Sequence, residues 1–136
     1  MKIVLAGSSH WHAEMHLDAA RFCGAEIAGI WDEDAQHARA FAMRQHLPFI
    51  ADFAKILSGP PDAILLMGHP FTMPARARTV IEAGIPLILE KPAASSTAAL
   101  AELRDLARQH QAFVSVPLPN RFGPAVTAFE RLRCQG

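Results

Sequence analysis

Apolar and polar residues follow two different patterns along this chain. Short runs dominated by apolar residues, typical of buried strands, are separated by longer stretches in which apolar residues recur every three or four positions, as on an amphipathic helix. We expect strands at 2–6, 26–31, 48–50, 63–67, 86–89 and 112–116. We expect helices at 11–22, 34–44, 52–57, 72–83, 96–111 and 124–133.

Residues at the ends of these segments support the helices. Asp34 can accept hydrogen bonds from the first-turn amides of its helix. Pro74 stands in the first turn of the helix that follows Thr72, and Gly84 stands where a left-handed residue would end it. Because strands and helices alternate, we predict an α/β fold, a doubly wound, Rossmann-like parallel sheet in three α/β/α layers.

The pattern changes near the C-terminus. Pro117-Leu118-Pro119 cannot serve a central strand, because proline has no amide hydrogen to donate. We expect residues 1–118 to form a Rossmann-like dinucleotide-binding domain. Residues 119–136, with their predicted helix, are expected to begin a second domain that is otherwise missing or truncated.

Composition and charge narrow the classes of function. Hydrophobic residues make up 51% of the 136 residues, enough for one packed core. The 13 basic residues balance the 13 acidic ones, so neither a nucleic-acid partner nor a membrane surface is expected. The two cysteines, Cys23 and Cys134, lack metal-ligand spacing, and the N-terminus lacks the apolar run of a signal peptide. We expect a cytoplasmic protein.

The loop after the first strand is the first candidate site, because doubly wound sheets bind ligands beyond the carboxyl ends of their strands. The dinucleotide fingerprint requires glycine at its first, third and sixth positions, and only Gly7 matches. Amides at a helix N-terminus can still hold a pyrophosphate, although Ser9 should push it outward. The candidate cofactor-binding residues of this loop are Gly7, Ser8, Ser9, His10, Trp11 and His12.

The same segment contains His10, His12 and His16, which suggests a metal site. His12 and His16 are four positions apart and can share a helix face. However, Glu14 falls one position too late for the zinc-protease pattern, and no cysteine or aspartate cluster within the segment completes a ligand set. We therefore expect no metal and interpret these histidines as the lining of a polar loop.

Asp32 ends the second strand, about 25 residues after Gly7, where a carboxylate suits the ribose hydroxyls of NAD. Two interpretations stay open: Asp32 binds ribose, or Asp32 or Asp34 only caps the next helix. A carboxylate at this point would repel the 2′-phosphate of NADP, and Glu33 stands where an arginine would favour it. NAD is therefore the expected cofactor, and NADP is disfavoured.

The most specific motif is Glu90-Lys91-Pro92, which follows an apolar strand. It places a lysine at the carboxyl edge of the sheet, where the side chain can donate to a substrate hydroxyl or, with its pKa lowered by burial, take its proton. A surface lysine after a strand is the alternative interpretation.

Together with Glu82-Ala83-Gly84, this motif resembles the Gfo/Idh/MocA family (glucose–fructose oxidoreductase and inositol dehydrogenase), and similar segments occur at 26–32, 62–67 and 120–124. The resemblance implies hydride transfer between a nicotinamide cofactor and a sugar, polyol or related hydroxy compound. It implies that Lys91 is catalytic and holds the reacting oxygen, and that Glu90 fixes the loop at the cofactor. It also implies that Asn120 and Arg121 lie near the cofactor or substrate.

Two departures from the family pattern bear on the site. After the fourth strand the family usually has Thr-Pro followed by a histidine, whereas this chain has Gly68-His69-Pro70-Phe71-Thr72-Met73-Pro74, with Met73 at the usual histidine position. Gly68 allows close backbone approach and His69 can point into the crevice, so both are candidate cofactor-binding residues. The family's second domain is missing, so we expect this chain alone to be inactive and a homo-oligomer to require that domain.

Two hypotheses of function remain. In the first, the chain is the nucleotide-binding half of an NAD-dependent oxidoreductase, which the Glu90-Lys91-Pro92 motif favours. In the second, it is a stand-alone module that binds or senses a dinucleotide without catalysis, which the degraded glycine fingerprint favours. A phospho-receiver-like domain is rejected, because it would need an acidic cluster where Gly7-Ser8-Ser9 stands.

Overall fold

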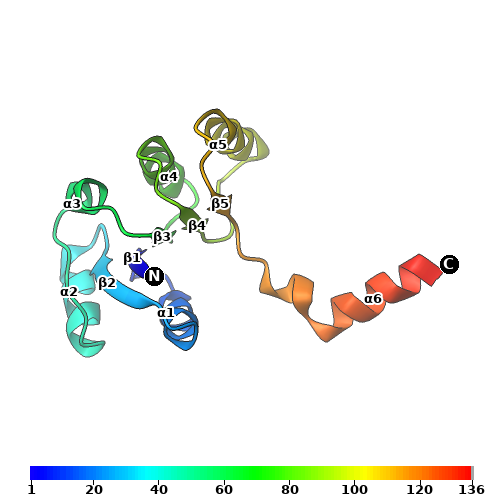
Figure 1. Cartoon of the computed structure of the whole chain (residues 1–136), viewed down its shortest axis with the longest axis horizontal. Coiled ribbons are helices and arrows are strands. Elements are labelled where there is room, and N and C mark those ends of the chain that lie inside the picture. The colour runs from blue at the N-terminus through cyan, green and yellow to red at the C-terminus, as the bar shows by residue number, and fades with distance from the viewer. Residues whose placement is uncertain (136) are drawn as a thin grey trace.

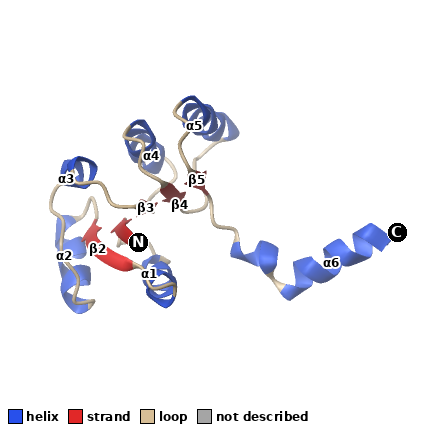
Figure 2. Cartoon of the chain, viewed as in Figure 1, coloured by secondary structure: helices blue, strands red, loops and turns tan. Residues whose placement is uncertain are grey.

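The computed structural model of the chain describes residues 1–135 and contains a parallel sheet with helices on both faces (Figure 1 and Figure 2). The strands are β1 (Lys2–Ala6), β2 (Glu26–Trp31), β3 (Ala63–Leu66), β4 (Leu87–Leu89) and β5 (Val114–Ser115). The helices are α1 (Ala13–Phe22), α2 (Ala35–Arg44), α3 (Phe53–Ser58), α4 (Met73–Glu82), α5 (Thr97–Gln109), the 3-10 turn η1 (Pro119–Phe122) and α6 (Pro124–Gln135).

The five strands are all parallel and lie in the order β2-β1-β3-β4-β5. The chain first builds outward from β1 to β2 and then returns to the other side of β1 to form β3. The strand order therefore reverses between β1 and β3, which is where a doubly wound sheet leaves a crevice for a ligand.

The register of the sheet brings four strand ends to one edge. Ala6 pairs with Trp31 on one side and with Leu66 on the other, and Leu66 pairs with Leu89. The loops after these strands consequently start side by side. Their first residues are Gly7, Asp32, Met67 and Glu90.

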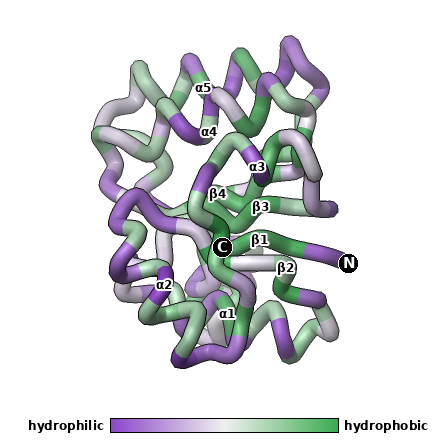
Figure 3. The backbone as a smooth tube through the Cα atoms, turned by 90° about the vertical axis from the view of Figure 1, so that its left-hand side faces the viewer, coloured by the Kyte–Doolittle hydropathy of each residue, from purple (hydrophilic) through white to green (hydrophobic). Residues whose placement is uncertain are grey.

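Two apolar layers hold the helices to the sheet. Alternate residues of β1 point to opposite faces: Ile3 and Leu5 join the core under α1 and α2, and Val4 and Ala6 join the core under α3, α4 and α5. In Figure 3 the central strands are mostly green, for hydrophobic residues, while purple hydrophilic residues gather on the outer helices and turns. The predicted three-layer α/β/α fold is confirmed.

One predicted strand is wrong. Residues 48–50 form only an isolated bridge between Ile30 and Phe49 at the outer side of β2. Ile30 donates its N–H to the carbonyl of Pro48 and accepts from the N–H of Ile50, both at 2.9 Å. Pro48 itself has no N–H with which to extend the ladder, and Asp52 begins the cap of α3 directly afterwards. An apolar run this short therefore forms a single bridge.

The C-terminal segment leaves the sheet as the prolines predict. After β5 the chain forms η1 and then α6, which extends away from the sheet and packs against η1 (Figure 1). Phe129 and Leu132 on α6 are 66% and 69% exposed. None of the described helices combines the length and the apolar character that crossing a membrane requires.

Candidate functional site

A cavity of about 270 Å³ opens at the carboxyl edge of the sheet, between the loops that follow β1 and β3. It brings together predicted residues from three separate segments, which are Gly7, Ser9, Asp32, Gly68 and His69. A larger groove of about 510 Å³ lies between α5 and β5. That groove is mostly apolar and contains none of the predicted site residues, so we place the candidate site at the carboxyl edge.

Gly7 lets the two loops approach each other. Its φ of 106° is in the region that favours glycine, and a Cβ atom built on it would lie 2.1 Å from the carbonyl oxygen of Met67. The Gly7 N–H also donates to the carbonyl of Trp31 at 2.8 Å. The first fingerprint position is therefore restricted to glycine by the sheet itself, whatever ligand binds there.

Asp32 ties the loop after β1 to the loop after β2. Its carboxylate, in a residue that is 7% exposed, accepts hydrogen bonds from the Ser9 N–H at 2.6 Å, the Asp34 N–H at 2.9 Å and the Ser8 hydroxyl at 3.4 Å. Asp34 is the residue that caps α2, where it accepts from two first-turn amides at 3.0 and 2.9 Å. Asp34 is thus the cap of α2, and both aspartates line the cavity.

The N-terminus of α1 points into the same edge. Its N-cap residue, His12, makes no side-chain cap hydrogen bond within the described part of the chain. Uncapped amides at a helix N-terminus attract anions such as phosphate. A side chain is tolerated at His12, the third fingerprint position, because the close contact between α1 and the sheet falls one residue later, at Ala13, which is 2% exposed.

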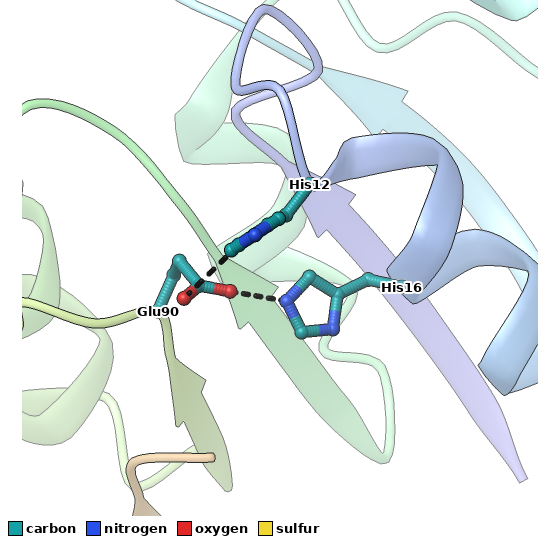
Figure 4. Close-up of side chains that lie close together, drawn as sticks. All are labelled: His12, His16 and Glu90. Carbon is teal, nitrogen blue, oxygen red and sulfur yellow. Dashed lines mark hydrogen bonds and ion pairs between the residues drawn. The ribbon is translucent and has the colours of Figure 1, made fainter. Parts of the chain in front are cut away.

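A second cluster lies at the end of β4, where His12, His16 and Glu90 point toward one another (Figure 4). Glu90 is 2% exposed, and its Oε1 accepts the Lys91 N–H at 2.8 Å. Its Oε2 contacts Nε2 of His16. Nδ1 of His12 lies 3.4 Å from Oε1, within ion-pair range but without hydrogen-bond geometry.

The surroundings of this cluster shift the pKa values of Glu90 and of the neighbouring His10. Burial by itself would raise the pKa of the Glu90 carboxyl, but the hydrogen bonds from His16 and from the Lys91 N–H, with the nearby imidazoles, outweigh it and hold that pKa below its usual value. Burial lowers the pKa of His10, against the opposing effect of Glu90. The carboxylate is therefore ionised at neutral pH, and His10 is uncharged.

Lys91 lies beside this cluster. Its side chain is half-buried, and Nζ is 5.1 Å from the centre of the Trp11 ring. Trp11 is 77% exposed and contacts His12, with ring centres 3.6 Å apart and ring planes tilted by 39°. A cation over an exposed indole at the sheet edge can still donate a hydrogen bond to a ligand oxygen.

Gly68 and His69 both line the cavity. The exposed His69 side chain stacks on Phe71, and Gly68 has room for a Cβ atom, 3.7 Å from that of Met73. Asn120 and Arg121 lie exposed on η1 and line neither the cavity at the carboxyl edge nor the groove between α5 and β5.

Sequence reasoning missed Arg76. Its guanidinium lies at the cavity, 3.4 Å from a carboxylate oxygen of Glu33 and 5.2 Å from the centre of the Trp31 ring. Arg76 belongs to α4, whose sequence gives no signal that the helix reaches the end of β2. Only the order of the strands brings these two elements together.

The comparisons with known proteins agree with this architecture. The sequence model of the oxidoreductase family Gfo/Idh/MocA, described as having an NAD-binding Rossmann fold, matches residues 1–118. No curated protein sequence is significantly similar to the chain.

Several solved structures share the fold. WlbA dehydrogenase from Bordetella pertussis, in complex with NADH and UDP-GlcNAcA, has a TM-score of 0.90 and 21% identity over 99% of this chain and 42% of its own. The UDP-N-acetylglucosamine 3-dehydrogenase GnnA from Acidithiobacillus ferrooxidans has a TM-score of 0.84 and 21% identity over 97% and 43%. Biliverdin reductase from Synechocystis, with biliverdin and NADP+, has a TM-score of 0.81 and 19% identity over 96% and 42%.

These identities establish a shared fold, and the chain spans less than half the length of each of these proteins. The family match is stronger, because it covers the whole sheet and every loop of the carboxyl edge. The chain therefore belongs to the Gfo/Idh/MocA family of oxidoreductases with an NAD-binding Rossmann fold.

Proposed function

We propose that this chain is the NAD-binding part of an oxidoreductase that transfers hydride between the nicotinamide ring and a sugar, polyol or related hydroxy compound. The observation that carries the proposal is the cavity at the strand-order reversal. The glycine turn at Gly7 and the buried carboxylate of Asp32 line this cavity, and the N-terminus of α1, whose N-cap residue makes no side-chain cap hydrogen bond, lies at the same edge of the sheet.

The residues present fit the cofactor. Asp32 would accept hydrogen bonds from the adenosine ribose hydroxyls, and the first-turn amides of α1 would hold the pyrophosphate. Bound NAD would supply the hydride acceptor. Ser9 has its N–H engaged by Asp32, so its exposed side chain, and not its amide, would face the phosphate.

Charge at the cavity favours NAD over NADP. Asp32 and Glu33 place two carboxylates beside the ribose position, and both would repel a 2′-phosphate. Arg76 is a cation at the same cavity, but its guanidinium is paired with Glu33. The net local charge thus disfavours the additional phosphate of NADP.

Lys91 is proposed as the catalytic residue that holds the reacting oxygen. It lies at the carboxyl edge, after β4, and its backbone is fixed through the hydrogen bond to the buried carboxylate of Glu90. A sugar-type substrate is proposed because of two similar structures: WlbA was solved with UDP-GlcNAcA, and GnnA is named as a UDP-N-acetylglucosamine 3-dehydrogenase. Hydroxyl-rich substrates suit a site in which a lysine donates to oxygen.

We further propose that residues 119–136 belong to a second unit, because α6 leaves the sheet with Phe129 and Leu132 exposed. A cytoplasmic location is part of the same proposal. The free, exposed thiols of Cys23 and Cys134 suit a reducing compartment.

Titration of the chain with NADH and with NADPH, followed by nicotinamide fluorescence, tests the proposal. We expect saturable binding that is at least about tenfold tighter for NADH, since two carboxylates oppose the 2′-phosphate. Asp32→Ser should narrow that ratio to within about threefold, and Asp105→Ser, which removes an exposed carboxylate on α5, should leave it unchanged.

Two outcomes would contradict the proposal. If neither NADH nor NADPH binds the folded chain, the proposed NAD-binding function is wrong. An NADH/NADPH ratio that is unaffected by Asp32→Ser would show that this carboxylate only fixes the loop.

A further inference from the structure

We propose that His12, His16 and Glu90 form a binding site for a divalent transition-metal ion, with Zn²⁺ the best match. The site lies outside the cavity at the strand-order reversal, on the side of the loop toward β4. None of these three side chains lines that cavity, although His12 begins the helix whose first-turn amides are proposed to hold the pyrophosphate.

The fold assembles the ligands from two elements. His12 begins α1 and His16 follows one turn later, so the two imidazoles project from the same side of the helix. Glu90 comes from the end of β4, 74 residues after His16 in the sequence. The three ligand atoms all lie within 4.8 Å of one another (Figure 4).

These separations suit one ion. Ligand atoms of a tetrahedral zinc ion, at about 2.0–2.1 Å from the metal, are roughly 3.3 Å apart. Nδ1 of His12 lies 3.4 Å from Oε1 of Glu90, close to that value. His16 is already in contact with the other carboxylate oxygen, so an ion between the three groups requires only small side-chain movements.

The three side chains of the cluster are mostly buried, unlike a chance grouping of histidine and glutamate at the protein surface. The side chains of His12, His16 and Glu90 are 13%, 12% and 3% exposed. Nδ1 of His12 is buried with no hydrogen-bond partner among the described residues, although it faces a carboxylate. A metal ion would satisfy this nitrogen by accepting the lone pair that a neutral imidazole offers.

Neighbouring groups orient the ligands. The Lys91 N–H donates to Oε1 of Glu90 at 2.8 Å, which fixes the carboxylate from behind, as a second layer of hydrogen bonds does in metalloproteins. The Trp11 ring packs against His12, with ring centres 3.6 Å apart and ring planes tilted by 39°. The ring of His10 lies 5.3 Å from that of His12, between centres, and its Nδ1 accepts the His12 N–H at 3.2 Å.

The donor set determines the class of metal. Two imidazoles and one carboxylate suit zinc, iron, cobalt or nickel, whereas Mg²⁺ and Ca²⁺ prefer oxygen ligands throughout. Three protein ligands leave at least one coordination position open, unlike the four ligands of a structural zinc site. The site is therefore expected to bind Zn²⁺ reversibly and to retain a water molecule.

Competition with a chromogenic chelator tests the proposal on the metal-stripped chain. We expect one equivalent of Zn²⁺ to bind, and His12→Ala and His16→Ala each to weaken it by at least about tenfold. His110→Ala removes an exposed histidine at the end of α5 and should leave the affinity unchanged. Unchanged affinity in both site variants, or no binding by the unaltered chain, would overturn the proposal.

A second measurement needs no substitution. Histidine ring signals in nuclear magnetic resonance spectra of the unaltered chain should shift for His12 and His16 when Zn²⁺ is added, while those of His37, His46 and His110 stay in place. Shifts confined to the other histidines would contradict the site. Both experiments omit NADH, so a negative result would leave the proposed NAD-binding function intact.

Discussion

At the scale of single residues, the sheet edge depends on a few positions whose backbone or carboxylate cannot be replaced. Gly7 is one, because the carbonyl of Met67 occupies the space where a side chain would start. Asp32 is another, because three donors from two loops converge on it. The same constraint does not apply at Ser9 and His12, which explains how two of the three fingerprint glycines can be absent.

Gly7→Ala should destabilise the fold by about 2 kcal/mol or more, because it combines a left-handed backbone with a steric clash. Gly24→Ala is the matched control: its φ is also positive, at 71°, but no atom lies within 4 Å of the added Cβ. Its cost should be about 1 kcal/mol. The free energy of unfolding from urea titration measures both, and equal losses would show that the loops after β1 and β3 can separate freely.

At the scale of elements, the sequence predicts most of the fold from local signals. The bounds of β1 and β2 are confirmed, as are the Asp34 cap and the left-handed Gly84, with a φ of 70° after α4. The strand at 48–50 is wrong because its pairing ends after one bridge, and hydropathy does not report pairing.

The candidate site is predictable only where its residues are close in sequence or follow a known spacing. Gly7 and Asp32 satisfy such a spacing, and both line the cavity. The contact of His12 and His16 with Glu90 depends on β3 lying between β1 and β4, which no local pattern encodes. The pattern within residues 10–16 predicts no metal, because the third proposed ligand, Glu90, comes from another element.

Helix capping gives a test at this scale. Asp34→Ala removes an acceptor for two first-turn amides of α2, whereas Ser96→Ala removes an acceptor for one amide of α5, at 3.1 Å. We expect losses in the free energy of unfolding of about 1–2 kcal/mol for Asp34→Ala and about 1 kcal/mol or less for Ser96→Ala. A stability unchanged by Asp34→Ala would contradict its role as the cap and reopen that role for Asp32.

At the scale of the whole molecule, one property of the topology organises the site. The four strands that end at Ala6, Trp31, Leu66 and Leu89 are in register, so four loops meet at one edge while the opposite edge carries none of the proposed functional residues. Beyond η1, α6 extends sideways away from the sheet (Figure 1). Cofactor binding is therefore expected to depend on the sheet and its loops and not on α6.

Amide chemical shifts of the ¹⁵N-labelled chain, recorded with and without NADH, test the central claim most directly. If NAD binds at the strand-order reversal, the largest shifts should fall on Gly7, Ser9, Asp32 and Gly68, with little change along α6. Largest shifts at Leu100 and Ala107, in the groove between α5 and β5, would place the ligand elsewhere. No shifts at saturating NADH would contradict the account of this chain as an NAD-binding domain.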